Sequence, residues 1–254
     1  MYFDIHAHFE HNDLKQSIDI VKKAISSGVK KIAAVSENRT GSEKNLLLKK
    51  EFPENILTGC GFHPAHLAST PDDLISEELE YIQNNCSRFD MIGEVGYDFC
   101  RVKDQSIRKK QVDFFEGVLE AAAVEKKVIN IHSRWALRKT LERVIQFKKQ
   151  TGINAVMHWF TQSKKLIRLA NDNGIYVSVG PTLLFFEETS SAVKEISSEL
   201  LLTETDSPVP FNGRNASPEW IPDIVKKLAK VRNCGADEMK MQLKKNFNSF
   251  ISSS

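Results

Sequence analysis

The chain has 254 residues, a formal net charge of +2, 41% hydrophobic residues and 27% charged residues. This length is enough for one large α/β domain or two small ones, with a full buried core. No apolar run approaches the length of a bilayer-spanning helix, which argues against a membrane protein. The nearly balanced charge excludes a strongly basic surface that would bind nucleic acid along its whole length. Any positive potential that attracts a polyanion must therefore be local to one site.

The cysteines and the first residues predict a cellular location. The four cysteines are scattered, without the Cys-x-x-Cys spacing of a zinc site or the pattern of a disulfide framework. A strand begins almost at the first residue, which leaves no room for a signal peptide. We therefore expect a cytoplasmic protein.

Strand patterns and helix patterns alternate along the chain. Strands are expected over residues 3–9, 31–36, 55–64, 91–98, 128–132, 153–159, 176–179 and 200–204. Helices are expected over residues 14–27, 42–51, 105–125, 135–150, 163–173, 190–197 and 236–250, and from residues 71 and 218 onward. Thr70 and Ser217 precede prolines as expected N-cap residues, and Gly28 ends the first helix.

Eight strands that alternate with helices in a chain of this length predict an α/β fold, a (β/α)₈ TIM barrel. We expect residues 1–254 to form it as a single domain. The alternative is a doubly wound open sheet, but no Gly-x-Gly-x-x-Gly motif follows any predicted strand. In a TIM barrel the active site lies at the carboxyl ends of the strands.

The first strand carries two histidines. Regular alternation places Asp4, His6 and His8 on one face, with Phe3 and Ile5 on the other. Buried imidazoles need partners, because an unpaired buried polar group costs about 1–3 kcal/mol. A metal ion is a suitable partner, since imidazole is the commonest metal ligand. Asp4 is expected either to accept an imidazole proton or to cap the start of the strand.

Four further residues with metal-binding side chains lie at the ends of later strands. They are Glu94, His132, His158 and Asp206. Glu94 lies between Gly93 and Gly96, which allow other groups to approach the backbone closely. Together with the two N-terminal histidines, these side chains predict a two-metal site rather than a single structural zinc.

Six segments resemble, in order and spacing, the motifs of the TatD-like deoxyribonuclease family of the amidohydrolase superfamily. The segments are residues 4–8 (DIHAH), 61–64 (GFHP), 93–98 (GEVGYD), 131–134 (IHSR), 158–160 (HWF) and 204–208 (ETDSP). The resemblance covers nearly the whole chain and implies a metal-dependent hydrolase of phosphodiester bonds in DNA. It implies that the metal ligands are His6, His8, Glu94, His132, His158 and Asp206. Glu94 would bridge the two ions. It also implies that His63 and Arg134 lie near the scissile phosphate.

The chain departs from the commoner family pattern at two places that border the predicted pocket. Tyr97 stands where an aliphatic residue is usual. Residues 159–162, Trp-Phe-Thr-Gln, replace a turn similar to Cys-Phe-Ser-Gly. Tyr97 and Trp159 are expected either to stack on a base or to pack in the core or rim.

The resemblance thus implies a deoxyribonuclease with two divalent ions, Mg, Mn or Zn, as cofactors. Two such ions lower the pKa of a bridging water towards about 7 and stabilise the leaving oxygen. Asp206 is expected to orient or deprotonate this water, and Glu94 to hold the ions together. The expected substrate is single-stranded DNA or 3′ ends, attacked by a 3′–5′ exonuclease. Two alternatives stay open: another hydrolase on the same metal site, such as a lactonase, phosphotriesterase or deacylase, and a non-catalytic barrel that serves as a partner in a complex.

Overall fold

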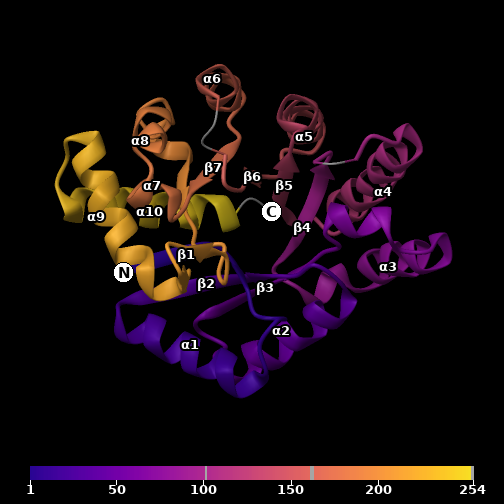
Figure 1. The fold of residues 1–254 in the computed structure, drawn as a ribbon, viewed down its shortest axis with the longest axis horizontal. Coiled ribbons are helices and arrows are strands. Elements are labelled where there is room, and N and C mark those ends of the chain that lie inside the picture. The colour runs from indigo at the N-terminus through magenta and orange to yellow at the C-terminus, as the bar shows by residue number, and fades with distance from the viewer. Residues whose placement is uncertain (101, 161–162, 253–254) are drawn as a thin grey trace.

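The computed structural model describes residues 1–100, 102–160 and 163–252, and within them eight parallel strands form one sheet in the order β1 to β8. Helices surround this sheet (Figure 1). The strands are β1 (Tyr2–His8), β2 (Val29–Val35), β3 (Ile56–Cys60), β4 (Met91–Asp98), β5 (Val128–Arg134), β6 (Ala155–Met157), β7 (Tyr176–Val179) and β8 (Leu201–Thr203). The predicted TIM barrel is confirmed.

The first and last strands meet and nearly close the barrel. A parallel bridge joins Ala7 to Ser207. The amide of His8 donates to the carbonyl of Ser207 over 2.7 Å, and the amide of Asp206 donates to the carbonyl of His6 over 2.9 Å. This closure places the two N-terminal histidines beside the residue that follows β8.

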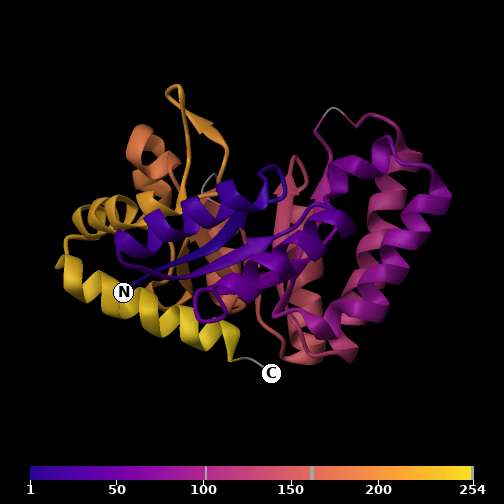
Figure 2. The same cartoon turned by 90° about the horizontal axis from the view of Figure 1, so that it is seen from below.

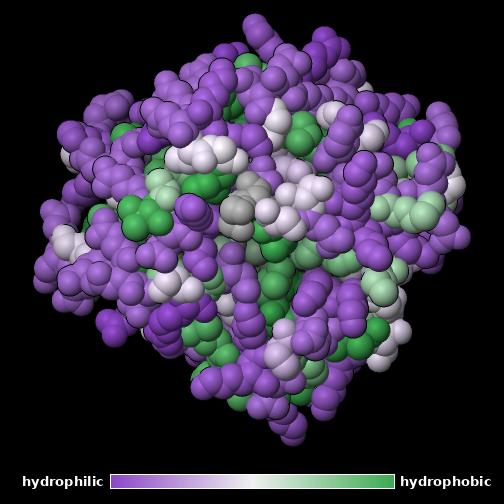
Figure 3. Space-filling view, turned by 180° about the vertical axis from the view of Figure 1, so that it is seen from behind, coloured by the Kyte–Doolittle hydropathy of each residue, from purple (hydrophilic) through white to green (hydrophobic). Residues whose placement is uncertain are grey.

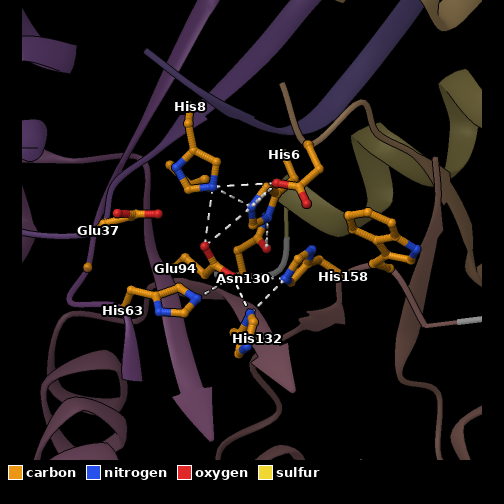
Figure 4. Close-up of polar contacts among 12 residues, drawn as sticks. His6, His8, Glu37, His63, Glu94, Asn130, His132 and His158 are labelled. Atoms are coloured by element: carbon orange, nitrogen blue, oxygen red, sulfur yellow. Dashed lines mark hydrogen bonds and ion pairs between the residues drawn. The ribbon is translucent and has the colours of Figure 1, made fainter. Parts of the chain in front are cut away.

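The side chains of β1 do not alternate regularly, which corrects the predicted placement of Asp4. The register of β1 against β2 shifts between Asp4 and Ala7. Ile5 packs in the apolar interior of the barrel, although the next side chain, His6, faces the site (Figure 4). The carboxylate of Asp4 accepts hydrogen bonds from the backbone N–H and the hydroxyl of Thr205, at 3.0 and 2.5 Å. Asp4 therefore joins β1 to the end of β8 and binds no imidazole ring.

The helices form the outer layer of the barrel. They are α1 (Leu14–Ser26), α2 (Arg39–Glu51), α3 (Asp72–Asn85), α4 (Gln105–Val124), α5 (Leu137–Thr151), α6 (Lys164–Asp172), α7 (Thr182–Phe185), α8 (Glu187–Val193), α9 (Ile221–Arg232) and α10 (Ala236–Ile251). Asp13 caps α1 by accepting from the amide of Gln16 over 2.7 Å. Gly28 follows α1 with a φ of +94°, which glycine adopts without strain. Among the described residues, no helix is long and apolar enough to cross a membrane.

Two predicted N-caps are wrong. The hydroxyl of Thr70 donates to the carbonyl of His66 over 2.9 Å, and α3 begins at Asp72 without a side-chain cap. Ser217 makes no capping hydrogen bond either, because the chain from Pro218 first forms a 3₁₀ turn and only then enters α9. In both places the proline correctly marks the approach to a helix, but another local hydrogen-bond pattern replaces the side-chain cap.

The helix predicted near residues 190–197 is only partly confirmed. α8 covers residues 190–193 but begins earlier, at Glu187, after the short α7, and it ends at Val193. Beyond it, the amide of Ser197 donates to the side-chain oxygen of Asn171 over 3.0 Å. This tertiary hydrogen bond holds the segment outside a helix.

The two ends of the barrel differ. At one end, α10 covers an interior apolar cluster drawn from most of the strands, and Phe247 stacks on Phe3 with ring centroids 4.5 Å apart. At the other end a short hairpin of β9 (Pro210–Phe211) and β10 (Arg214–Asn215) projects (Figure 2). The face behind the view of Figure 1 is mostly hydrophilic, with a few hydrophobic residues near its centre (Figure 3).

Candidate metal centre

The side chains predicted as metal ligands converge at the carboxyl end of the barrel (Figure 4). They come from β1, β4 and β5 and from the segments after β6 and β8, and they are His6, His8, Glu94, His132, His158 and Asp206. A cleft of about 760 Å³ opens above them. The structure brings together all of these residues, at the end of the barrel where TIM-barrel sites are built.

Glu94 lies between two groups of histidines, and each of its carboxylate oxygens faces one group. Oε2 lies 3.6 Å from Nε2 of His6 and 3.2 Å from Nε2 of His8. Oε1 lies 2.6 Å from Nδ1 of His132 and 2.8 Å from Nε2 of His158. One carboxylate can therefore supply a ligand atom to each of two cations.

One further residue joins each group. Asp206 completes the first, because its Oδ1 lies 3.5 Å from Nε2 of His6 and 3.6 Å from Nε2 of His8. His63 borders the second, with Nε2 at 3.6 Å from Oε1 of Glu94. The first group thus offers two imidazoles and two carboxylates, a donor set suited to zinc or to other divalent metals.

Hydrogen bonds behind the first two imidazoles fix which nitrogen carries the proton. Nδ1 of His6 lies 2.8 Å from Oδ1 of Asn130, whose amide group donates to the carbonyl of Ile5. Nδ1 of His8 lies 2.9 Å from Oε1 of Glu10. The two Nε2 atoms therefore face each other across 3.0 Å, and although burial opposes protonation, the neighbouring carboxylates raise the pKa of both rings. Two imidazole nitrogens this close, beside two carboxylates that attract positive charge, form a donor set that fits a metal ion in place of a proton.

The second group is supported in a similar way. Nε2 of His132 lies 3.3 Å from Oδ2 of Asp98, which leaves Nδ1 to face the centre. Nδ1 of His158 is buried, has no hydrogen-bond partner among the described residues, and lies 3.8 Å from Oε2 of Glu204. Such outer partners orient metal-binding imidazoles. The sequence analysis missed all of these supporting residues, which are Glu10, Asp98, Asn130 and Glu204.

The charges of the cluster keep Glu94 ionised. Burial raises the pKa of this carboxyl, but the imidazoles around it, among which His132 and His6 have raised pKa values, outweigh burial and hold its pKa well below the usual range. Burial lowers the pKa of His63 and of His158 to about 4, so both rings are neutral near neutral pH. For His132, burial opposes protonation, but Glu94 and Asp98 raise its pKa to about 9. A metal ion would replace the proton that these carboxylates attract.

Glycines allow the backbone around Glu94 to pack closely, as predicted. A Cβ at Gly93 would lie 2.6 Å from a side-chain atom of β5, and one at Gly96 would overlap the carbonyl oxygen of His132. A Cβ at Gly61, which was not predicted to matter, would overlap the backbone of Glu94. No larger residue fits at these places without moving the backbone beside the site.

Both residues expected near a scissile phosphate line the cleft. Nδ1 of His63 accepts a hydrogen bond from the amide of Ala65 over 3.1 Å, so Nε2 of the neutral ring carries the proton and can donate it. Arg134 is the last residue of β5, and its side chain is exposed at the cleft. A hydrogen-bond donor and a fixed positive charge thus border the cluster of ligands.

The two aromatic departures from the family pattern have different surroundings. Tyr97 is 1% exposed and packs in the core, so it cannot stack on a substrate. Trp159 lines the cleft, its amide donates to Oε1 of Glu204 over 2.7 Å, and its ring lies 5.7 Å from that of Phe211. The last two positions of that segment, Thr161 and Gln162, lie outside the described residues.

A TIM barrel with four imidazoles and two carboxylates at its carboxyl end has the architecture of a metal-dependent hydrolase. The model of the family described as TatD related DNase matches residues 3–252. The chain therefore belongs to the TatD family of metal-dependent hydrolases.

Relatives match over nearly their whole lengths. An uncharacterized metal-dependent hydrolase of Methanocaldococcus jannaschii is 26% identical over 253 residues, 98% of this chain and 96% of that protein. One from Mycoplasma genitalium is 30% identical over 263 residues, 96% of this chain and 97% of that protein. The crystal structure of a TatD homologue from Escherichia coli K12 superposes with a TM-score of 0.86 at 22% identity, covering 98% of this chain and 97% of that one. At this low sequence identity, the similarity to the Escherichia coli structure shows that the two chains share a fold.

Proposed function

We propose that this chain hydrolyses phosphodiester bonds in DNA with the help of two divalent ions. The observation that supports two ions is the position of Glu94, whose Oε2 and Oε1 face separate histidine groups. His6, His8 and Asp206 would hold one ion with Glu94, and His132 and His158 the other. Bound there, two ions activate a water and stabilise the leaving oxygen.

The residues around the cluster supply the remaining chemistry. Asp206 lines the cleft and belongs to the first group, where its carboxylate can orient the attacking water and accept its proton. His63 can donate its Nε2–H to a phosphate oxygen, because its Nδ1 is already an acceptor for Ala65. Arg134 can pair with the charge of the same or the next phosphate. Glu94 stays ionised and so remains a ligand.

The proposed substrate is a single strand or a frayed 3′ end, and the proposed reaction is 3′–5′ exonucleolytic. The cleft of about 760 Å³ is a pocket at a barrel mouth rather than a long groove. Arg134 is the one Lys or Arg among its described lining residues, so the cleft can grip only a few phosphates. The unpaired cysteines support a reducing compartment, which we propose is the cytoplasm.

The test compares a linear single-stranded oligonucleotide, the same oligonucleotide blocked at its 3′ end, and a closed circle, with Mg²⁺, Mn²⁺ and Zn²⁺ in turn. We expect cleavage of the open linear strand alone. Equal cleavage of the circle would overturn the exonuclease. If none of the three is cleaved but small lactones, phosphotriesters or acylated amines are turned over, the alternative of another hydrolase on the same metal site is favoured. The low positive charge of the cleft supports that alternative. Absence of both activity and bound metal would favour a non-catalytic partner.

A further inference from the structure

Trp135 stands out on the rim of the cleft because its large apolar side chain is 75% exposed. It directly follows Arg134, the last residue of β5, whose side chain lines the cleft. The residue therefore lies at the carboxyl end of the barrel, beside the candidate metal centre. Exposing a whole indole has a cost in hydration that packing within the chain does not offset.

The backbone of Trp135 adds to this cost. Its φ is +58°, in the left-handed region that bulky residues avoid. Trp159, which follows the neighbouring strand β6, has a φ of +47°, but its amide bonds to Glu204 and its ring contacts Phe211. Those contacts account for the conformation of Trp159. At Trp135 the same conformation only presents the ring to solvent, and such outliers cluster at binding sites.

The charges around Trp135 select the kind of ligand. Residues 134–139 read Arg-Trp-Ala-Leu-Arg-Lys, with three cations and no acidic residue. Arg138 and Lys139 lie in the first turn of α5; Arg138 pairs with Glu142 at 3.1 Å, and Lys139 lies over the Tyr97 ring at 5.6 Å. An exposed aromatic plane whose neighbours in the sequence include three cations complements a single-stranded polynucleotide, which offers unpaired base faces and phosphates together. A duplex hides those faces in its stack.

We propose that Trp135 is a base-stacking platform for a nucleotide that lies outside the cleft, while Arg134 contacts a phosphate between that nucleotide and the metal centre. The proposal rests on the proposed function and adds to it a site that selects single strands. The Trp135 platform would bind a nucleotide away from the bond that is hydrolysed. It would therefore determine which length of substrate binds and whether a single strand is preferred to a duplex.

The experiment measures fluorescence anisotropy of a labelled phosphorothioate oligothymidylate of about ten nucleotides, which resists hydrolysis, on the metal-loaded protein. Trp135→Ala should weaken binding roughly 10-fold, within the range known for stacking on one base, and Trp135→Phe should retain most of the affinity. Oligonucleotides with one abasic position, moved along the strand, should lose affinity on the native protein at one position. At that position Trp135→Ala should cause no further loss, because both changes remove the same contact.

Met241→Ala is the matched control, since this exposed apolar residue (67%) lies on α10 at the opposite end of the barrel, and its loss should leave binding unchanged. Equal affinity of the native protein and Trp135→Ala would overturn the platform and leave the proposed function intact. Failure of the native protein to bind or cleave single strands would instead overturn the proposed function and the platform with it. A dimer that dissociates in Trp135→Ala, with unchanged oligonucleotide binding, would assign the indole to a second copy and also overturn the proposal.

Discussion

Nε2 of His6 lies 3.0 Å from Nε2 of His8, although Nδ1 of each ring is already bound to an acceptor. Burial opposes protonation of these rings, but the neighbouring carboxylates raise the pKa of both, so a proton can join the two nitrogens and a metal ion can replace that proton. The same atoms lie near carboxylate oxygens of Glu94 and Asp206. The site therefore attracts positive charge, which a metal ion can supply in place of a proton.

Metal removal should abolish activity and also destabilise the fold. Without an ion, buried acceptors repel each other, and a ligand at a hundred times its Kd contributes about 2.7 kcal/mol to stability. We expect chelation to stop hydrolysis and lower Tm, and added divalent ions to restore both, as measured by turnover, calorimetry and metal analysis. Full activity in excess chelator, with no metal in the protein, would falsify the metal centre.

Glu94→Gln should reduce the metal content. An amide retains one carbonyl oxygen but loses the second anionic oxygen, so it cannot bind both groups equally. The variant should hold fewer ions per chain than the native protein by elemental analysis, and its hydrolysis should fall by several orders of magnitude. Glu43→Gln is a suitable control, because Glu43 pairs with Arg88 away from the cleft. Unchanged metal content in Glu94→Gln would show that this residue does not bridge.

Asp206→Asn should separate binding from turnover. If the carboxylate orients and deprotonates the attacking water, the amide should lower kcat by several orders of magnitude while KM changes little. The far-UV circular dichroism should stay native, because Asp206 bonds to β1 through its backbone amide, which the substitution preserves. A native kcat would show that another group accepts the proton.

Asn130→Ala should weaken the metal centre through His6. The change removes the acceptor of Nδ1 and the donor to the Ile5 carbonyl, and an unpaired buried group costs about 1–3 kcal/mol. Metal affinity should fall about 10- to 100-fold, as for other outer partners of metal-binding imidazoles. Asn246→Ala is the matched control. Asn246 is equally buried and donates to two carbonyls near α10, so its loss should lower denaturant stability but leave metal affinity unchanged.

The Glu37–His66 pair should respond to pH in a defined window. The hydrogen bond from His66 lowers the pKa of Glu37 to about 2 from its ordinary 4.5, and Glu37 in turn raises the pKa of His66 above its ordinary 6.5. The contribution of Glu37 to the stability of the fold is present above pH 4.5 and is lost as the pH falls towards 2. The contribution of His66 to stability is present below pH 6.5 and is lost as the pH rises through the raised pKa of His66. The pair therefore stabilises the fold most between pH 4.5 and 6.5.

The measurement is an NMR titration of the His66 ring. Glu37→Gln should bring its pKa down towards the ordinary value, and the effect on stability should be small, since the His66 side chain is 41% exposed. An unchanged His66 pKa in this variant would contradict the pairing.

The sequence predicted which side chains gather at the carboxyl end of the barrel, because the ends of parallel strands in a barrel must meet. It also contained signals that were overlooked. Asn130 lies two residues before His132, and Glu204 two before Asp206, so regular alternation placed each on the face of a predicted ligand. Asn212-Gly213, with φ of 48° and 74°, is a typical hairpin turn between β9 and β10.

Other features depend on contacts that no local pattern contains. The register shift in β1 arises where this strand pairs with β2 and meets β8, so the displacement of Asp4 from the face of His6 could not be seen from alternation. The end of α8 depends similarly on Asn171, which lies on another helix. Local patterns predicted the elements, but tertiary hydrogen bonds decided their irregularities.

Salt dependence should reveal how many phosphates the cleft neutralises. On single strands each neutralised phosphate contributes about 0.7 to the slope of log K against log salt, and few cations line the cleft, so we expect a shallow slope. Arg134→Ala should reduce that slope by about one phosphate and weaken binding equally for different base sequences, because a phosphate contact carries no base information. Arg168→Ala is the control, since Arg168 on the outer helix α6 pairs with Glu195, which follows α8. A steep native slope, or an Arg134→Ala variant with altered base preference and unchanged slope, would contradict a phosphate contact at Arg134.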